Sequence, residues 1–84
     1  MITNFKAELE GMLFEFKTIY VVKLQLFQVY VAYAGRKIRF HMQQNPSGTF
    51  YITDPNACPE VYRVLEPDLN QLILAHSKLI EADY

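Results

Sequence analysis

The sequence has a single cysteine, Cys58, no tryptophan and three glycines among its 84 residues. One cysteine cannot form an internal disulfide, so the chain is not a disulfide scaffold, and a lone thiol favours a reducing compartment. Long hydrophobic runs are missing too. The most apolar stretch, residues 19–34, is interrupted by Lys23 and two glutamines and is too short to span a bilayer. The first residues lack the pattern of a signal peptide. We therefore expect a soluble, cytoplasmic protein with no membrane partner.

An excess of charge of one sign is also absent, because eight lysines and arginines stand against nine aspartates and glutamates. This balance excludes a histone-like polycation. The hydrophobic content of 51% excludes a disordered chain. The length allows one domain, and we expect residues 1–84 to form a single small α+β domain.

The N-terminal segment carries apolar residues at helical spacing, which predicts a helix from about Asn4 to Lys17. Gly11 inside this segment would cost a helix about 1 kcal/mol relative to alanine. From Thr18 the residue types change to β-branched and aromatic, which favours a strand. The sequence leaves open whether residues 19–26 are helix or strand. The helical stripe consists of Phe5, Leu9, Met12, Leu13, Phe16 and Tyr20.

The centre of the chain predicts a hairpin with Gly35 and Arg36 as a two-residue turn. This register places Ala34 opposite Lys37 and Tyr30 opposite His41. One face of the hairpin is then mixed and basic, and the other is wholly apolar or aromatic. The apolar face consists of Phe27, Val29, Val31, Tyr33, Ile38, Phe40 and Met42.

A turn follows at Asn45-Pro46-Ser47-Gly48. A three-residue loop with Gly48 in the left-handed region would place Phe50 and Ile52 on the apolar face, whereas a two-residue loop would invert them. We favour the three-residue loop because it buries both side chains.

Residues 61–65 fit either a short fourth strand or a helical turn, and we favour the strand. Pro67 is well placed at the start of a C-terminal helix that ends at about Ala82. The predicted fold is thus α+β in two layers, with an N-terminal helix, a three- or four-stranded antiparallel meander and a C-terminal helix.

The hairpin also concentrates positive charge, since residues 21–45 contain four basic side chains and no acidic one. Single-stranded nucleic acid is bound by such cations together with stacking aromatic rings. Nucleic-acid binding is our alternative function. The isoelectric point of about 6.0 is lower than that of a typical nucleic-acid-binding domain, and a solvated outer sheet face would explain the same basic residues. The candidate residues are Tyr30, Arg36, Lys37, Arg39, His41 and Tyr51.

Two apolar residues, Phe14 and Leu74, depart from the apolar stripes of the two predicted helices. Exposed apolar residues are common singly. One such residue on each predicted helix would nevertheless fit a second layer of helices from a partner subunit. We therefore assign Phe14 and Leu74 to a hypothetical interface of a two-fold homodimer.

The residues that could carry chemistry are few: Cys58 and two histidines, His41 and His76, far apart in the sequence. No cluster has the spacing of a metal site, and no glycine-rich loop could hold phosphate. We therefore expect no catalytic residue, no metal and no cofactor. The sequence favours a small non-enzymatic interaction module that binds a second copy of itself or another protein.

Overall fold

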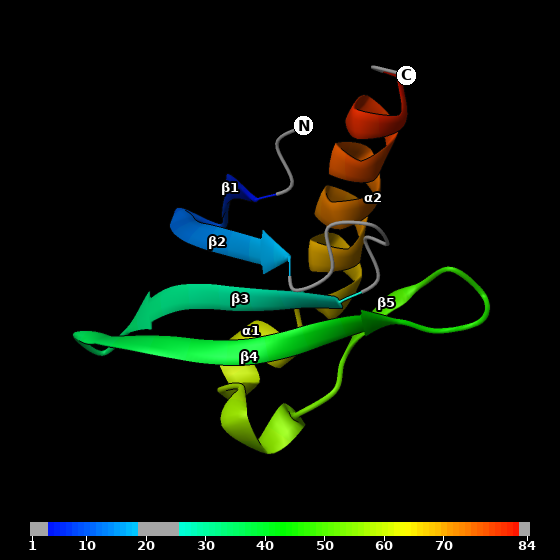
Figure 1. The fold of residues 1–84 in the computed structure, drawn as a ribbon. Helices are drawn as coiled ribbons and strands as arrows, with labels where there is room; N and C mark the ends of the chain where they lie inside the picture. The colour runs from blue at the N-terminus through cyan, green and yellow to red at the C-terminus, as the bar shows by residue number, and fades with distance from the viewer. Residues whose placement is uncertain (1–3, 19–25, 83–84) are drawn as a thin grey trace.

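The computed structural model describes residues 4–18 and 26–82, and the side chains of these residues as far as His76. Five strands form one antiparallel sheet in chain order (Figure 1): β1 (Phe5–Leu9), β2 (Met12–Thr18), β3 (Leu26–Tyr33), β4 (Arg36–Gln44) and β5 (Phe50–Ile52). A 3-10 turn, η1 (Pro55–Ala57), then leads to helices α1 (Glu60–Arg63) and α2 (Glu66–Ala82).

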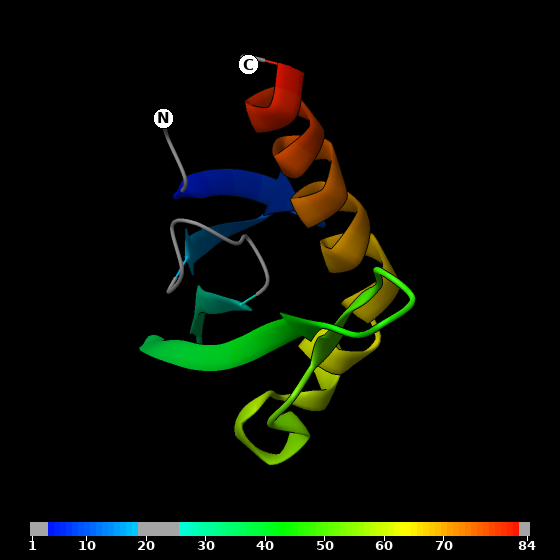
Figure 2. The same cartoon turned by 45° about the vertical axis from the view of Figure 1, so that its right-hand side comes forward.

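The mixture of a sheet and a C-terminal helix agrees with the predicted α+β fold, while the strand count and the N-terminal helix do not. Helix α2 begins one residue before Pro67 and ends at Ala82, as predicted. It runs across the strands, along the direction in which they succeed one another (Figures 1 and 2). None of the helices in the described part of the chain is long and apolar enough to cross a membrane.

The predicted N-terminal helix is wrong, because this segment is the β1–β2 hairpin. Glu10 and Gly11 form its turn, with φ angles of 54° and 75°. Positive φ at both central residues defines the tight turn that matches strand twist, and glycine adopts it without steric cost. Leu9 therefore pairs with Met12, and Phe5 pairs with Phe16. The helical spacing misleads because four residues of the stripe, Phe5, Leu9, Met12 and Phe16, also share one face of the hairpin, while Leu13 lies on the other.

The β3–β4 hairpin turns at Ala34 and Gly35, with φ angles of 52° and 78°, and not at Gly35 and Arg36. The predicted register is consequently wrong by two residues, and Tyr30 pairs with Arg39 instead of His41. A shift of two keeps every side chain on its predicted face. The observed register also places Phe27 opposite Met42, where the predicted one would have placed it opposite Gln44.

The loop before β5 has the predicted geometry. The backbone N–H of Asn45 donates to the carbonyl of Thr49 across a three-residue loop, and Gly48 has a φ angle of 86°. Phe50 and Ile52 are consequently buried.

The favoured strand at residues 61–65 is wrong, since α1 occupies Glu60–Arg63. The backbone N–H groups of Tyr62 and Arg63 donate to the carbonyl of Pro59, and the buried Tyr62 donates its hydroxyl to the carbonyl of Ala32 at 2.9 Å. The question of helix or strand at residues 19–26 falls outside the described residues, apart from Leu26, which begins β3.

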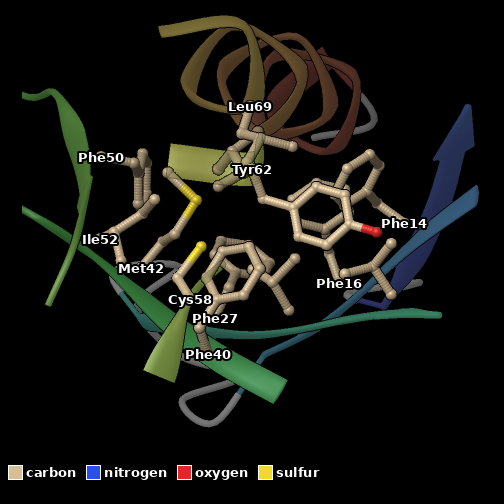
Figure 3. Close-up of a cluster of buried hydrophobic side chains, with 13 residues drawn as sticks. Phe14, Phe16, Phe27, Phe40, Met42, Phe50, Ile52, Cys58, Tyr62 and Leu69 are labelled. Atoms are coloured by element: carbon tan, nitrogen blue, oxygen red, sulfur yellow. The ribbon is translucent and has the colours of Figure 1, made fainter. Parts of the chain in front are cut away.

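The core lies between the sheet and the two helices (Figure 3), and aromatic rings dominate it. Phe14 and Tyr62 meet edge to face with ring centroids 5.6 Å apart. Leu69 and Ile73 bring α2 onto the same cluster. Apolar burial of this kind is the main force that holds a small domain together. The buried hydrophobic residues are Phe14, Phe16, Phe27, Val29, Val31, Phe40, Met42, Phe50, Ile52, Cys58, Tyr62, Leu69 and Ile73.

Two side chains of α2 bond the outer backbone groups of β5. The backbone N–H of Phe50 donates to Oδ1 of Asn70 at 2.7 Å, and the N–H of Ile52 donates to Oε2 of Glu66 at 2.9 Å. Both N–H groups point away from β4, so they would otherwise form an open sheet edge. The spacing of four residues places both acceptors on one face of α2. This edge of the sheet is therefore closed by the helix.

We expect Asn70→Ala to lower the free energy of unfolding by about 1–3 kcal/mol, because it leaves the buried N–H of Phe50 without an acceptor. Urea unfolding followed by circular dichroism measures this loss. Gln71→Ala is the matched control, since Gln71 is the exposed neighbour on the same helix. Equal losses for the two variants would contradict the assigned role of Asn70.

Candidate functional site

The outer face of the sheet, opposite the helices, carries most of the predicted basic site. Strand alternation brings together Tyr30 on β3, Lys37, Arg39 and His41 on β4, and Tyr51 on β5. Arg36 does not belong with them. It pairs with Tyr33 at the end of the hairpin and shares the strand parity of Phe40 and Met42, which face the core.

Tyr30 is the centre of this outer face. The Nζ atoms of Lys17 and Lys37 lie 4.9 and 5.0 Å from the centre of its ring. Its hydroxyl donates to Gln28 at 3.2 Å, and Lys37 also lies 3.9 Å from a carboxylate oxygen of Glu15. Such exposed ion pairs contribute about 0–1 kcal/mol each. The cations of the face are thus partly engaged with its own tyrosine and acid.

His41 is held by Asp54, which lies in the loop after β5. One carboxylate oxygen of Asp54 accepts the backbone N–H of His41 at 2.7 Å, and the other lies 3.0 Å from the imidazole Nδ1. Two contacts from one carboxylate fix both the backbone and the ring of His41. This arrangement anchors the loop to the sheet, and it leaves the imidazole with a structural partner.

Next to Tyr30 the outer face is hollowed between β2, β3 and β4. The small side chain of Ala32 lies between the larger Leu13, Tyr30 and Lys37, and Glu15 completes this part of the rim. Leu13 is 52% exposed at the edge of this hollow. The hollow is therefore lined by an exposed leucine, a tyrosine and side chains of both charges.

Cys58 lies inside the core between the sheet and α1 (Figure 3). Burial raises the pKa of its thiol to about 11, with the nearby charges of Arg63, Asp54 and Glu66 as smaller influences. The thiol is therefore neutral at physiological pH and is a poor nucleophile. His76 is on the opposite side of the sheet from His41 and stacks on Phe5, with ring centroids 3.9 Å apart. Within residues 4–18 and 26–82, no three histidine, cysteine or acidic residues come together as metal ligands.

Of the two residues assigned to a partner interface, Phe14 is not where that hypothesis placed it, whereas Leu74 does lie on the predicted C-terminal helix. Phe14 is fully buried on β2 and contacts Tyr62, so it has no surface to offer. Leu74 is half-buried and packs against the core cluster. Both assignments rested on helix faces, and the first of those helices does not exist. Helix α2 already covers the face on which Phe14 lies.

A different candidate interface, the free edge of β1, was missed by the sequence reasoning. β1 is an outer strand of the sheet, and β2 is its only strand partner in the described part of the chain. In a two-residue hairpin the residues that flank the turn exchange hydrogen bonds, so Phe5, Ala7 and Leu9 bond β2. The backbone groups of Lys6 and Glu8 therefore point away from the sheet. The strand alternation of Phe5, Ala7 and Leu9 before a glycine turn was the available signal.

No protein-family model, no curated protein and no solved structure matches this chain, so its function must be argued from its own residues.

The raised pKa of Cys58 predicts a pH dependence of stability. The fold favours the protonated thiol, so its contribution is complete below the ordinary pKa of 9.0 and is lost as pH rises towards about 11. We expect the difference in free energy of unfolding between the wild type and Cys58→Ala to shrink over this interval. Urea midpoints measured from pH 8 to pH 11 test it, and a constant difference would contradict it.

Proposed function

We propose that the protein is a non-enzymatic interaction module that associates first with a second copy of itself. The two edges of its sheet support this proposal because they differ. Glu66 and Asn70 occupy the outer N–H groups of β5. No comparable contact covers the backbone of Lys6 and Glu8 on β1 among the described residues. Natural proteins block free edges because an open edge is a template for another strand.

The outer face of the sheet would then bind a different protein. Pairing through an edge leaves this face uncovered, and two exposed large hydrophobic residues, Leu13 and Tyr51, lie on it. Tyr30 is half-exposed between them. Aromatic residues surrounded by charge are typical of protein interfaces. A reducing compartment such as the cytoplasm fits the free thiol of Cys58.

Nucleic-acid binding remains the second candidate, because Lys17, Lys37 and Arg39 gather around Tyr30 on one open face. Two features favour the protein partner instead. The ammonium groups of both lysines lie over the ring that a base would stack on, and Glu15 places a negative charge beside Lys37. A backbone phosphate would meet this carboxylate at short range.

Self-association predicts a dimer in solution. We expect light scattering during size-exclusion chromatography to give a mass near twice 9.8 kDa, which falls towards the monomer on dilution. This mass should depend on salt far less than phosphate binding does, because backbone hydrogen bonds and apolar contacts respond weakly to ions and only a few exposed charges are screened. A monomer at every concentration would overturn the proposal.

Two charge-reversal variants that change the net charge equally test nucleic-acid binding against the protein partner. We expect the wild type, Lys37→Glu/Arg39→Glu and Arg36→Glu/Arg63→Glu to elute alike, without excess absorbance at 260 nm, in a low-salt purification. The first variant alters the outer face, and the second alters exposed arginines that do not lie on it. Excess absorbance that only the first variant removes would reassign the outer face to nucleic acid.

A further inference from the structure

We propose that two copies of the protein pair antiparallel through β1. The two-fold axis passes between Ala7 of one copy and Ala7 of the other, so that the two sheets join into a single sheet of ten strands. The inference rests on the proposed self-association and specifies its register. It depends on three properties of Phe5–Leu9: the direction of its backbone groups, the order of its charges and the nature of its inner face.

The backbone fixes which residues can bond the second copy. Phe5, Ala7 and Leu9 are committed to β2, which leaves the N–H and carbonyl groups of Lys6 and Glu8 directed outwards. In an antiparallel pair centred on Ala7, Lys6 exchanges two hydrogen bonds with Glu8 of the second copy. The two-fold axis repeats the same exchange. Ala7 then lies opposite its own copy at a position without hydrogen bonds, where side chains come closest.

The charges select this register from its neighbours. With the axis at Ala7, Lys6 stands directly opposite Glu8 of the second copy, and both ion pairs lie on the outer face. A shift of two residues in one direction places Lys6 opposite Lys6, and a shift in the other places Glu8 opposite Glu8. Like charges directly opposite on a sheet are destabilising. A shift by one residue would turn the charges onto the apolar face.

The inner face is self-complementary as well. Phe5, Ala7 and Leu9 are half-buried and pack against the core. In the proposed register Phe5 lies opposite Leu9 of the second copy, so the apolar layer continues across the axis. The ring of Phe5 is already fixed, because it stacks on Phe16 with centroids 4.4 Å apart and on His76 at 3.9 Å.

Helix α2 leaves room for the second copy. It extends beyond β1 along the direction in which the strands succeed one another (Figures 1 and 2). The six residues from His76 to Ala82 rise about 9 Å, nearly two strand spacings, and so reach over the partner strand. The two copies of Phe5 are four positions apart along the strands, about 13 Å. Helices that cross at these positions clear one another, since packed helices need about 8–10 Å.

A cysteine on the axis tests the register. In a Cys58→Ala background, Ala7→Cys should form an intermolecular disulfide on mild oxidation, because paired Cα atoms without hydrogen bonds are about 4.5 Å apart. Lys6→Cys is the matched control. It lies two positions from its own copy, at about 8 Å, beyond the reach of a disulfide. Non-reducing electrophoresis of both variants, each first shown to be dimeric by light scattering, measures the cross-link.

Charge reversal tests the same register without a new covalent bond. We expect Glu8→Lys alone to raise the dimer dissociation constant about tenfold, because it places like charges opposite each other twice. Lys6→Glu combined with Glu8→Lys should restore the wild-type value, since the opposite charges then merely exchange strands. Sedimentation of each variant measures the constant, and urea unfolding verifies the fold, because Lys6 also lies beside Glu15 of β2.

The possible results distinguish the register from the association itself. A cross-link at Ala7 with rescue by the double reversal supports both. A dimer that cross-links at Lys6 instead, or that ignores Glu8→Lys, overturns the register and leaves the proposed self-association standing. A protein that is monomeric at every concentration overturns both.

Discussion

One helix has to cover one face of a five-stranded sheet, and the rest of the structure follows from this constraint. Five strands span about 19 Å between the outer two, and a helix of 17 residues is about 25 Å long. Only a helix that crosses the strands can touch both edges, and α2 does so: it bonds β5 through Asn70 and contacts β1 through His76. A crossing helix, however, covers only a narrow strip of each strand. Large side chains have to fill the remainder, which explains why phenylalanines dominate the core and why Tyr62 comes in from α1.

The same crossing makes the two edges of the sheet unequal. Helix α2 starts at β5, where its first turns are close enough for Glu66 and Asn70 to bond the edge strand. By the time it reaches β1 it lies over the inner face of the strand, where His76 stacks on Phe5, and its remaining turns continue beyond the edge. A single straight helix cannot close both edges in the same way. The open edge of β1 is thus a consequence of how the core is covered.

The sequence predicted the structure correctly where a pattern of residues was compatible with only one local structure. Strand alternation in β3 and β4 identified the buried face, and that face survived a register error because the error was an even number of residues. Gly48 decided the loop before β5, since only one loop length buried Phe50 and Ile52 together. Helix α2 was recognisable by its apolar stripe and by Pro67. In each case the pattern and the burial requirement pointed to one answer.

The sequence was ambiguous where two patterns fitted the same residues. Between Phe5 and Phe16 the apolar positions satisfy both a helical and a strand period, and only the demands of the neighbouring strand decide between them. The glycine penalty at Gly11 was the one local sign against a helix. α1 was misread as well, and its hydrogen bond from Tyr62 to the carbonyl of Ala32 is a contact across 30 residues that no local pattern contains.

The error at the N-terminus also concealed the feature on which the proposed function rests. On a helix, Lys6 and Glu8 point in different directions and mean only a solvated surface. On a strand they share one face, two positions apart, with Ala7 between them. A segment that runs from apolar to positive, small, negative and apolar again becomes complementary to itself when a two-fold axis reverses its direction. The self-complementarity is present in the five letters FKAEL, but the proposed interface requires that the segment is a strand and that this strand is an edge. Both conditions come from the tertiary structure: the turn at Gly11 makes the segment a strand, and the crossing of α2 leaves it at an edge that nothing else bonds among the described residues.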